Sequence, residues 1–261
     1  FSSFNYSSTT QNMDLTNKTL TFVPYLDTSF KVYVRENDIY PPVSYYSHST
    51  VRTLNEDKIA TDNHYKYYLQ GNKFSFYNTF YNYVYIHGNG YLNFVGGDSS
   101  LLTGNYPNHF SKYRISAFLN NLINNSSGGE TNQADIYVGQ GPYGETVITY
   151  NNFSAIEIDP NNSSNSLSDN YNNFQIRLWT EEANSNFSGS YSDDHYPSGT
   201  IQISYGKSEH QTPLVGISNQ QTYNETTFVP LPYSNLLDKD YTEVTGLGVP
   251  KLDATFVFDI P

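Results

Sequence analysis

The chain has 261 residues, no cysteine and a formal net charge of −12, with 13 Lys and Arg against 25 Asp and Glu. This charge argues against nucleic-acid binding and against attachment to anionic membranes, because both need a basic surface. The lack of cysteine excludes a disulfide framework and thiolate chemistry. No apolar run approaches the roughly 18 residues of a transmembrane helix, so we expect no membrane insertion.

Composition favours a folded, all-β protein. Aromatic residues make up 16% of the chain, whereas disordered chains are depleted in them. The 26 Tyr and 16 Phe supply most of the apolar area for a core, and aromatic rings favour strands. We predict one main β domain at residues 20–245, with extensions at residues 1–19 and 246–261.

The first extension is polar and carries scattered rings at Phe1, Phe4 and Tyr6. It has neither the basic end nor the apolar centre of a secretory leader, so we expect a mature chain whose leader has been removed. A frayed tail and a strand that needs a partner are both compatible with this segment.

Residues 20–25 and 30–35 read as strands from their alternation and β-branched content. A long connection follows at residues 36–63 and is interrupted by two consecutive prolines. A second group of strands is expected to start at Tyr65.

The segment VYIHGNGYLNF, residues 84–94, predicts a hairpin whose register follows from parity. A three-residue loop at residues 88–90 pairs Ile86 with Leu92 and closes an apolar face, whereas a two-residue loop would pair apolar with polar side chains. Gly90 then takes the left-handed bulge position of such loops. The opposite face is expected to carry Tyr83, Tyr85, His87, Tyr91 and Asn93.

Later segments repeat this alternation, at residues 146–150, 173–179 and 200–205. Short alternating strands separated by Gly, Pro and Asn-Ser clusters predict a two-layer, jelly-roll-like antiparallel β-sandwich. One helical turn is expected at residues 115–123. Long polar loops, which glycans could occupy, are expected at residues 124–133, 157–172 and 180–199.

Five blocks of sequence resemble, in order, the nidogen-type (NIDO-like) extracellular module, in its form in secreted bacterial and algal surface proteins. The blocks are Phe74 to Phe94, Arg114 to Leu122, Asn173 to Trp179, Gly199 to Tyr205 and Val215 to Ser218. The resemblance covers residues 50–235 and implies a non-catalytic β-sandwich of adhesion, matrix and cell-surface proteins. The chain departs from that pattern at Asn120 and Asn121, where relatives usually carry acidic residues, and in its longer loop at residues 180–199.

No constellation for catalysis stands out, because the G-x-S-x-G, H-E-x-x-H, P-loop and dinucleotide motifs are all missing. The six His are dispersed, and His87 is expected at the surface. The carboxylate pairs Glu181-Glu182 and Asp193-Asp194 fall in a long loop, a poor place to hold two groups for glycoside hydrolysis. We expect no enzyme and no cofactor. Solvated acidic loops are the favoured interpretation over a Ca²⁺ site built from Asp193, Asp194, Asp238, Asp240 and Glu243.

Outward-facing aromatic residues suggest a recognition surface, because Tyr and Trp give contact area at low entropic cost. The candidates are Tyr83, Tyr85, Tyr91 and Trp179. They are interpreted as an interface between subunits, as a platform for sugar rings, or as rings that are simply common here or covered by other parts of the protein.

Location is indicated by N-x-[ST] sequons, of which there are nine where chance would give about six. We expect an extracellular glycoprotein at the cell surface, with covalently attached glycans. The candidate sites are Asn5, Asn17, Asn124, Asn125, Asn152, Asn161, Asn162, Asn186 and Asn224.

The leading hypothesis is a structural subunit of a surface filament, appendage or matrix. Strand-like segments near both ends could be donated to the sheet edge of a neighbour, a known mode of assembly that produces open polymers. The partners would be copies of the chain itself or other surface proteins. The residues expected in such contacts are Phe1, Phe4, Tyr6, Phe256 and Phe258, together with the outward aromatics. The alternative is an adhesive or carbohydrate-binding module.

Overall fold

The computed structural model describes only part of the chain. The described residues are 16–25, 29–35, 52–54, 64–69, 72–96, 111–120, 122–123, 135–141, 143–157, 166–181, 196–206, 214–220 and 257–259. They form an all-β, antiparallel sandwich, as the alternation predicts. Among these residues, no helix is long and apolar enough to cross a membrane.

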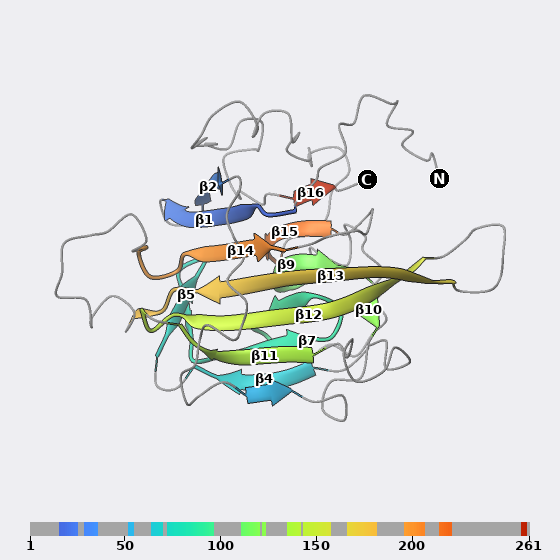
Figure 1. Cartoon of the computed structure of the whole chain (residues 1–261). Coiled ribbons are helices and arrows are strands. Elements are labelled where there is room, and N and C mark those ends of the chain that lie inside the picture. The colour runs from blue at the N-terminus through green and yellow to red at the C-terminus, as the bar shows by residue number, and fades with distance from the viewer. Residues whose placement is uncertain are drawn as a thin grey trace.

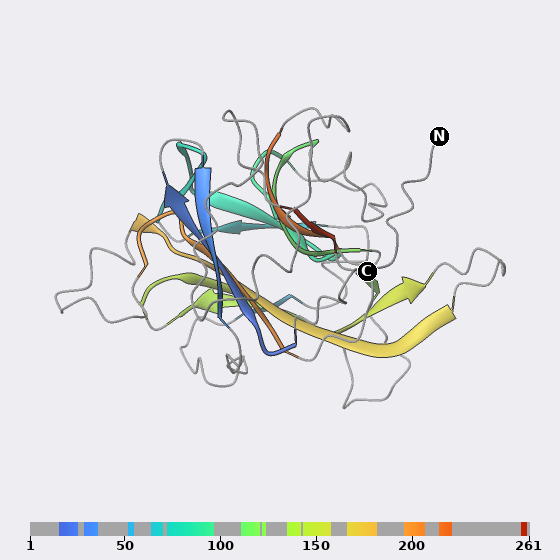
Figure 2. The same ribbon diagram turned by 90° about the horizontal axis from the view of Figure 1, so that it is seen from above.

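Sheet A has eight strands in the order β2-β1-β14-β13-β12-β11-β3, and β10 also pairs with β12. Its longest strands, β12 and β13, extend beyond their neighbours in both views (Figures 1 and 2). The strands are β1 (Thr19–Tyr25), β2 (Ser29–Arg35), β3 (Arg52–Leu54), β10 (Leu122–Ile123), β11 (Asp135–Gln140), β12 (Thr146–Glu157), β13 (Ser166–Leu178) and β14 (Ile201–Tyr205).

Sheet B has six strands in the order β16-β15-β9-β8-β7-β4, so β16 and β4 are its two edges. Seen from above, the two large sheets form two layers (Figure 2). The strands are β4 (His64–Tyr68), β7 (Tyr83–His87), β8 (Tyr91–Asn93), β9 (Tyr113–Leu119), β15 (Leu214–Asn219) and β16 (Val257–Asp259). A small third sheet pairs β5 (Phe74–Phe76) with β6 (Thr79–Tyr81).

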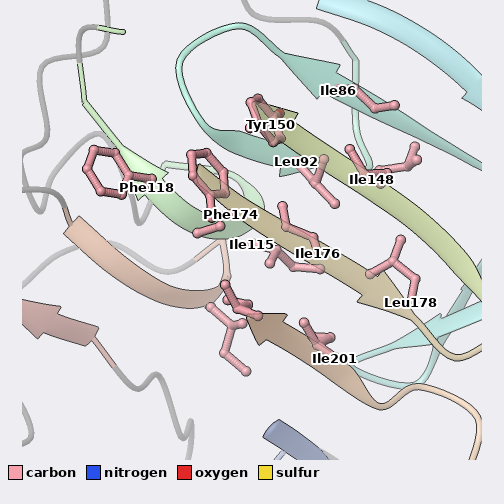
Figure 3. Close-up of a cluster of buried hydrophobic side chains, with 14 of the residues drawn as sticks. Ile86, Leu92, Ile115, Phe118, Ile148, Tyr150, Phe174, Ile176, Leu178 and Ile201 are labelled. Atoms are coloured by element: carbon pink, nitrogen blue, oxygen red, sulfur yellow. The ribbon is translucent and has the colours of Figure 1, made fainter. Parts of the chain in front are cut away.

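The core lies between the two sheets and is filled by their alternate residues. From sheet A, Ile148 pairs with Ile176, and Ile176 pairs with Ile203. From sheet B, Ile86 and Leu92 face them, and all five side chains are fully buried (Figure 3). Burial of aliphatic and aromatic area of this kind stabilises the fold without any disulfide.

Aromatic rings stack in the same core. The Phe174 ring stacks on Tyr150, with ring centroids 4.5 Å apart, and on Phe118 of sheet B, at 5.4 Å. The hydroxyl of Tyr150 donates to the His87 carbonyl oxygen at 2.7 Å, and that of Tyr205 donates to the Ala117 carbonyl oxygen at 2.7 Å. Both bonds therefore run from sheet A to sheet B.

The hairpin at residues 84–94 has the predicted register. Ile86 pairs with Leu92 across the loop at residues 88–90, and Gly90 has a φ of 78°. The loop is buried, because the Gly90 carbonyl oxygen accepts from the backbone N–H groups of Ala117 and Phe118. A Cβ built on Gly90 would lie 2.3 Å from the Phe118 carbonyl oxygen, so only glycine fits this contact.

Three expectations about secondary structure are wrong. The connection predicted at residues 36–63 contains β3, which pairs with β11. A helical turn is predicted at residues 115–123, but residues 115–119 belong to β9 and residues 122–123 form β10, because pairing with β8, β15 and β12 overrides local preference. Half of the loop expected at residues 157–172 is strand, since β13 begins at Ser166 and pairs Leu167 with Ile156 of β12. The predicted loop at residues 124–133 lies outside the described residues.

Candidate functional site on the outer face of sheet B

The outer face of sheet B carries large polar and aromatic side chains in two rows. In the first row, cross-strand pairing aligns His64 with His87, and His87 with Tyr91. In the second row, Lys66 pairs with Tyr85, which in turn pairs with Asn93 of β8. The predicted alternation of β7 and β8 is confirmed here.

One end of this face is a tyrosine–lysine patch, which we define as Lys66, Tyr68, Tyr83 and Tyr85. Tyr68 is 61% exposed, and Tyr83 and Tyr85 are half-buried. The Lys66 ammonium lies 3.9 Å from the centroid of the Tyr83 ring, 5.2 Å from that of Tyr68 and 5.6 Å from that of Tyr85. These are cation–π distances, so the rings and the charge hold each other in place.

The charge of Lys66 is maintained by its surroundings. Desolvation lowers its pKa, but the neighbouring phenol groups of Tyr68, Tyr85 and Tyr83, with a side-chain hydrogen bond that the ammonium donates to Tyr68, raise the pKa above its usual value. No carboxylate among the described residues pairs with this ammonium group. The patch therefore presents a cation among three rings at neutral pH.

The remainder of the face is a buried stack, which we define as Arg114, Tyr91, His87 and His64. The Arg114 guanidinium carbon lies 4.6 Å from the Tyr91 ring centroid, and Tyr91 stacks on His87 at 4.1 Å. His64 follows at 5.3 Å from His87. The first three are at most 2% exposed, so the expectation of exposed Tyr91 and His87 is wrong. Tyr91 lies between Arg114 and His87, and His87 lies between Tyr91 and His64.

Trp179 is also buried, at 1% exposed, which corrects its assignment to an exposed stacking surface. It lies at the end of β13, where its indole N–H donates to the Gln202 side-chain oxygen at 3.0 Å. Tyr143 and Tyr196 pack on its ring, with centroids 5.8 and 5.4 Å away. Glu145, two residues after Tyr143 in the sequence, is fully buried and accepts a hydrogen bond from the Tyr143 backbone N–H.

The outer face of sheet A is built differently, mainly from hydroxyl and amide side chains that bond one another, with Trp179 bonded to Gln202 at one end. Thr19 donates to Ser204 at 2.8 Å, and Gln175 donates to Thr149 at 2.9 Å. The half-buried Arg177 donates to the Gln175 side-chain oxygen at 2.9 Å. The polar groups of this face therefore form hydrogen bonds mainly with one another.

The second notable feature of sheet B is its other edge, where β16 pairs with β15. The register joins Leu214 to Asp259, Val215 to Phe258 and Gly216 to Val257. Of the residues predicted in strand donation, Phe258 therefore lies in an edge strand of its own chain. The others, Phe1, Phe4, Tyr6 and Phe256, lie outside the described residues.

Two predicted sequons fall within the described residues. Asn17 is exposed in a turn with a φ of 57°. Asn152 is half-buried in β12 with a φ of 59°, and its backbone N–H donates to the Asn173 side-chain oxygen. The sequons that lie outside the described part are Asn5, Asn124, Asn125, Asn161, Asn162, Asn186 and Asn224.

The predicted acidic candidates are not brought together in the described part of the chain. Glu181 is exposed, and its backbone N–H donates to the Lys73 carbonyl oxygen. No group of three or more His, Asp or Glu that could hold a metal occurs among the residues that the structure describes. The residues that lie outside it are Glu182, Asp193, Asp194, Asp238, Asp240 and Glu243.

Sequence reasoning missed two members of the tyrosine–lysine patch, Lys66 and Tyr68. The segment HYKYY of β4 alternates like the other strands, but its pairing with β7 is set by long-range register. A usable signal was the absence of Asp and Glu from residues 64–96 of an acidic chain.

No protein-family model, curated protein or solved structure matches this chain. The resemblance to the nidogen-type module therefore stays a prediction.

Proposed function

We propose that this chain is an extracellular structural subunit that assembles with copies of itself, β16 of one copy completing sheet B of the next. The observation that carries this proposal is the position of β16, a three-residue edge strand beside β15. The extracellular location is supported by the nine sequons.

The edge that β16 occupies needs a partner strand. Val215 and Ile217 of β15 are fully buried, and β9 pairs with β15 on its other side only. Without β16, the free edge of β15 would present unpaired backbone groups, which is the usual template for strand addition.

The connection between β15 and β16 is long enough for exchange between copies. Residues 220–256 separate the two strands. A connection of this length can reach about 100 Å when extended, far more than the strand spacing within a sheet. The three-pair contact makes β16 one of the least extensively paired strands of sheet B, so its release has a small free-energy cost.

A cysteine pair tests the exchange, and the cysteine-free chain makes the result easy to interpret. Val215→Cys and Phe258→Cys place two thiols at directly paired positions, with a Cα separation that a disulfide can bridge. Oxidation of the assembled protein should give a covalent ladder of oligomers on non-reducing gels, with a proportion that rises with protein concentration.

The controls separate exchange from chance oxidation. Each single variant should give at most a dimer. A double variant that forms only intramolecular disulfides, together with monodisperse monomers in solution, would overturn the proposal.

A second candidate function, adhesion, is favoured by a different observation. The tyrosine–lysine patch exposes rings at the β4 edge, opposite the β15–β16 edge of sheet B. A subunit that assembles through one edge keeps the other available for a ligand.

A further inference from the structure

The tyrosine–lysine patch combines exposed rings with one cation. Tyr68 is the most exposed of the large hydrophobic side chains in the described part of the chain. The ring centroids follow one another from Tyr68 to Tyr83 at 6.3 Å and from Tyr83 to Tyr85 at 5.6 Å. Neighbouring rings are turned by 69° and 84°, so they present faces and edges in turn to a ligand.

We propose that the tyrosine–lysine patch binds a polysaccharide whose sugars carry carboxylate groups. The C–H groups on the apolar face of one sugar pack against the exposed ring of Tyr68. The Lys66 ammonium pairs with a carboxylate of the same polymer. This inference deepens the second candidate function, adhesion, and is independent of strand exchange.

Charge complementarity argues for an acidic ligand. Residues 64–96 contain two Lys and two His but no Asp or Glu, in a chain whose net charge is −12. This stretch provides β4, β7 and β8, and thus the whole patch. An acidic polymer is repelled by most of the chain and finds a local cation here, which fixes where it binds.

The size of the patch argues for a carbohydrate over a protein. Three partly exposed rings offer about 300 Å² of contact area, from the roughly 150–250 Å² that a whole ring can bury. A stable protein interface needs about 800 Å² on each partner. A polysaccharide compensates for weak contact at one site by repeating it along the polymer and across assembled subunits.

The test measures binding of full-length protein to polygalacturonate, and to the same polymer with its carboxylates methyl-esterified. The unmodified polymer should bind more tightly, and the difference should shrink as salt is raised. Tyr68→Ala should weaken binding to both polymers about tenfold, since an exposed contact ring is lost. Lys66→Gln should weaken binding to polygalacturonate about fivefold and leave binding to the ester unchanged.

Lys73→Gln is the matched control. Lys73 is exposed and its ammonium lies 6.0 Å from the ring centroid of Phe80, outside the patch, so its loss should leave both affinities unchanged. Equal affinity for the two polymers, or no affinity for either, would overturn the proposal. Loss of self-association in Tyr68→Ala would do the same, by making the patch a subunit contact. Strand exchange is tested by the disulfide-linked oligomers and polysaccharide binding by the affinities, so either proposal can fail without the other.

Discussion

The outer faces of sheets A and B share the same alternation of side chains, yet they satisfy their polar groups in opposite ways. On sheet A, hydroxyl and amide groups such as Gln175 and Thr149 bond one another at close range. On sheet B, cations and rings stack, from the buried Arg114 on Tyr91 to Lys66 on the half-exposed Tyr83. The polar groups on sheet A use their hydrogen-bonding capacity on one another. The rings at the edge of sheet B keep part of their area exposed to solvent.

This difference indicates which face is available to a ligand, whereas the alternation of side chains is the same on both sheets. A face whose donors and acceptors already bond each other has little to offer a ligand. The ring-bearing face ends in Tyr68, which is 61% exposed beside a cation. Four predictions test how the two faces and the core between them are held, beginning with the turn that sets the register of the ring-bearing face.

Gly90→Ala should destabilise the fold by about 4 kcal/mol or more, because the new Cβ meets the Phe118 backbone oxygen at 2.3 Å and φ is positive. Gly96→Ala is the matched control. Gly96 has a similar φ of 76° but nothing within 4 Å, so only the conformational cost of about 1–2 kcal/mol remains. Urea unfolding of both variants measures the difference, and equal losses would remove the close approach as the cause.

The two arginines compare the faces directly. Arg114→Ala should cost about 3 kcal/mol, because it opens a cavity and removes a buried cation from the Tyr91 ring. Arg177→Ala on sheet A should cost about 1 kcal/mol, since that side chain is half-buried and its hydrogen bond to Gln175 is local. Thermal unfolding gives the ranking. If Arg177 proved the more important, the comparison of the two faces would be wrong.

Gln202→Leu should cost about 2 kcal/mol, because it leaves the buried indole N–H of Trp179 without its acceptor. Trp179 is the single Trp of the chain, so its fluorescence reports this site alone. Thr21→Val, which removes only a 3.5 Å contact with Gln202, should change stability by less than about 0.5 kcal/mol. An unchanged emission spectrum and stability in Gln202→Leu would show that the bond is unimportant.

Tyr150→Phe should cost about 1 kcal/mol at neutral pH, through loss of the hydrogen bond to the His87 carbonyl oxygen. Burial raises the pKa of Tyr150 well above its usual value of 10.0, so the folded state keeps the phenol proton. Stability is therefore full below pH 10 and falls as the pH rises above it, because the unfolded chain releases that proton.

The pH dependence gives the control for this variant. Each buried Tyr contributes a slope of up to about 1.4 kcal/mol per pH unit above pH 10. Tyr150→Phe should reduce that slope, so its disadvantage should shrink in alkaline solution. Urea unfolding between pH 9 and 11 measures the loss of stability in both proteins. An equal loss in the original protein and in Tyr150→Phe would contradict the assignment to Tyr150.

The sequence predicted the features that depend on parity and failed on those that depend on distant neighbours. The pairing of Ile86 with Leu92 and the positive φ of Gly90 follow from a few adjacent residues. The burial of Tyr91 depends on Arg114, which reaches it from β9. The patch itself required the register of β4 on β7, and no local signal reports that register.

The two phenol bonds across the core have a consequence for how the layers slide. An apolar interface resists separation but is nearly indifferent to small displacements along itself, because hydrophobic attraction has no direction. The hydroxyls of Tyr150 and Tyr205 are directional and reach carbonyl oxygens of the opposite layer at two separate points. Two such points are enough to fix both translation and rotation of one layer on the other. In a chain without cysteine, these two hydrogen bonds hold the sheets in register, as a disulfide between them could do in another protein.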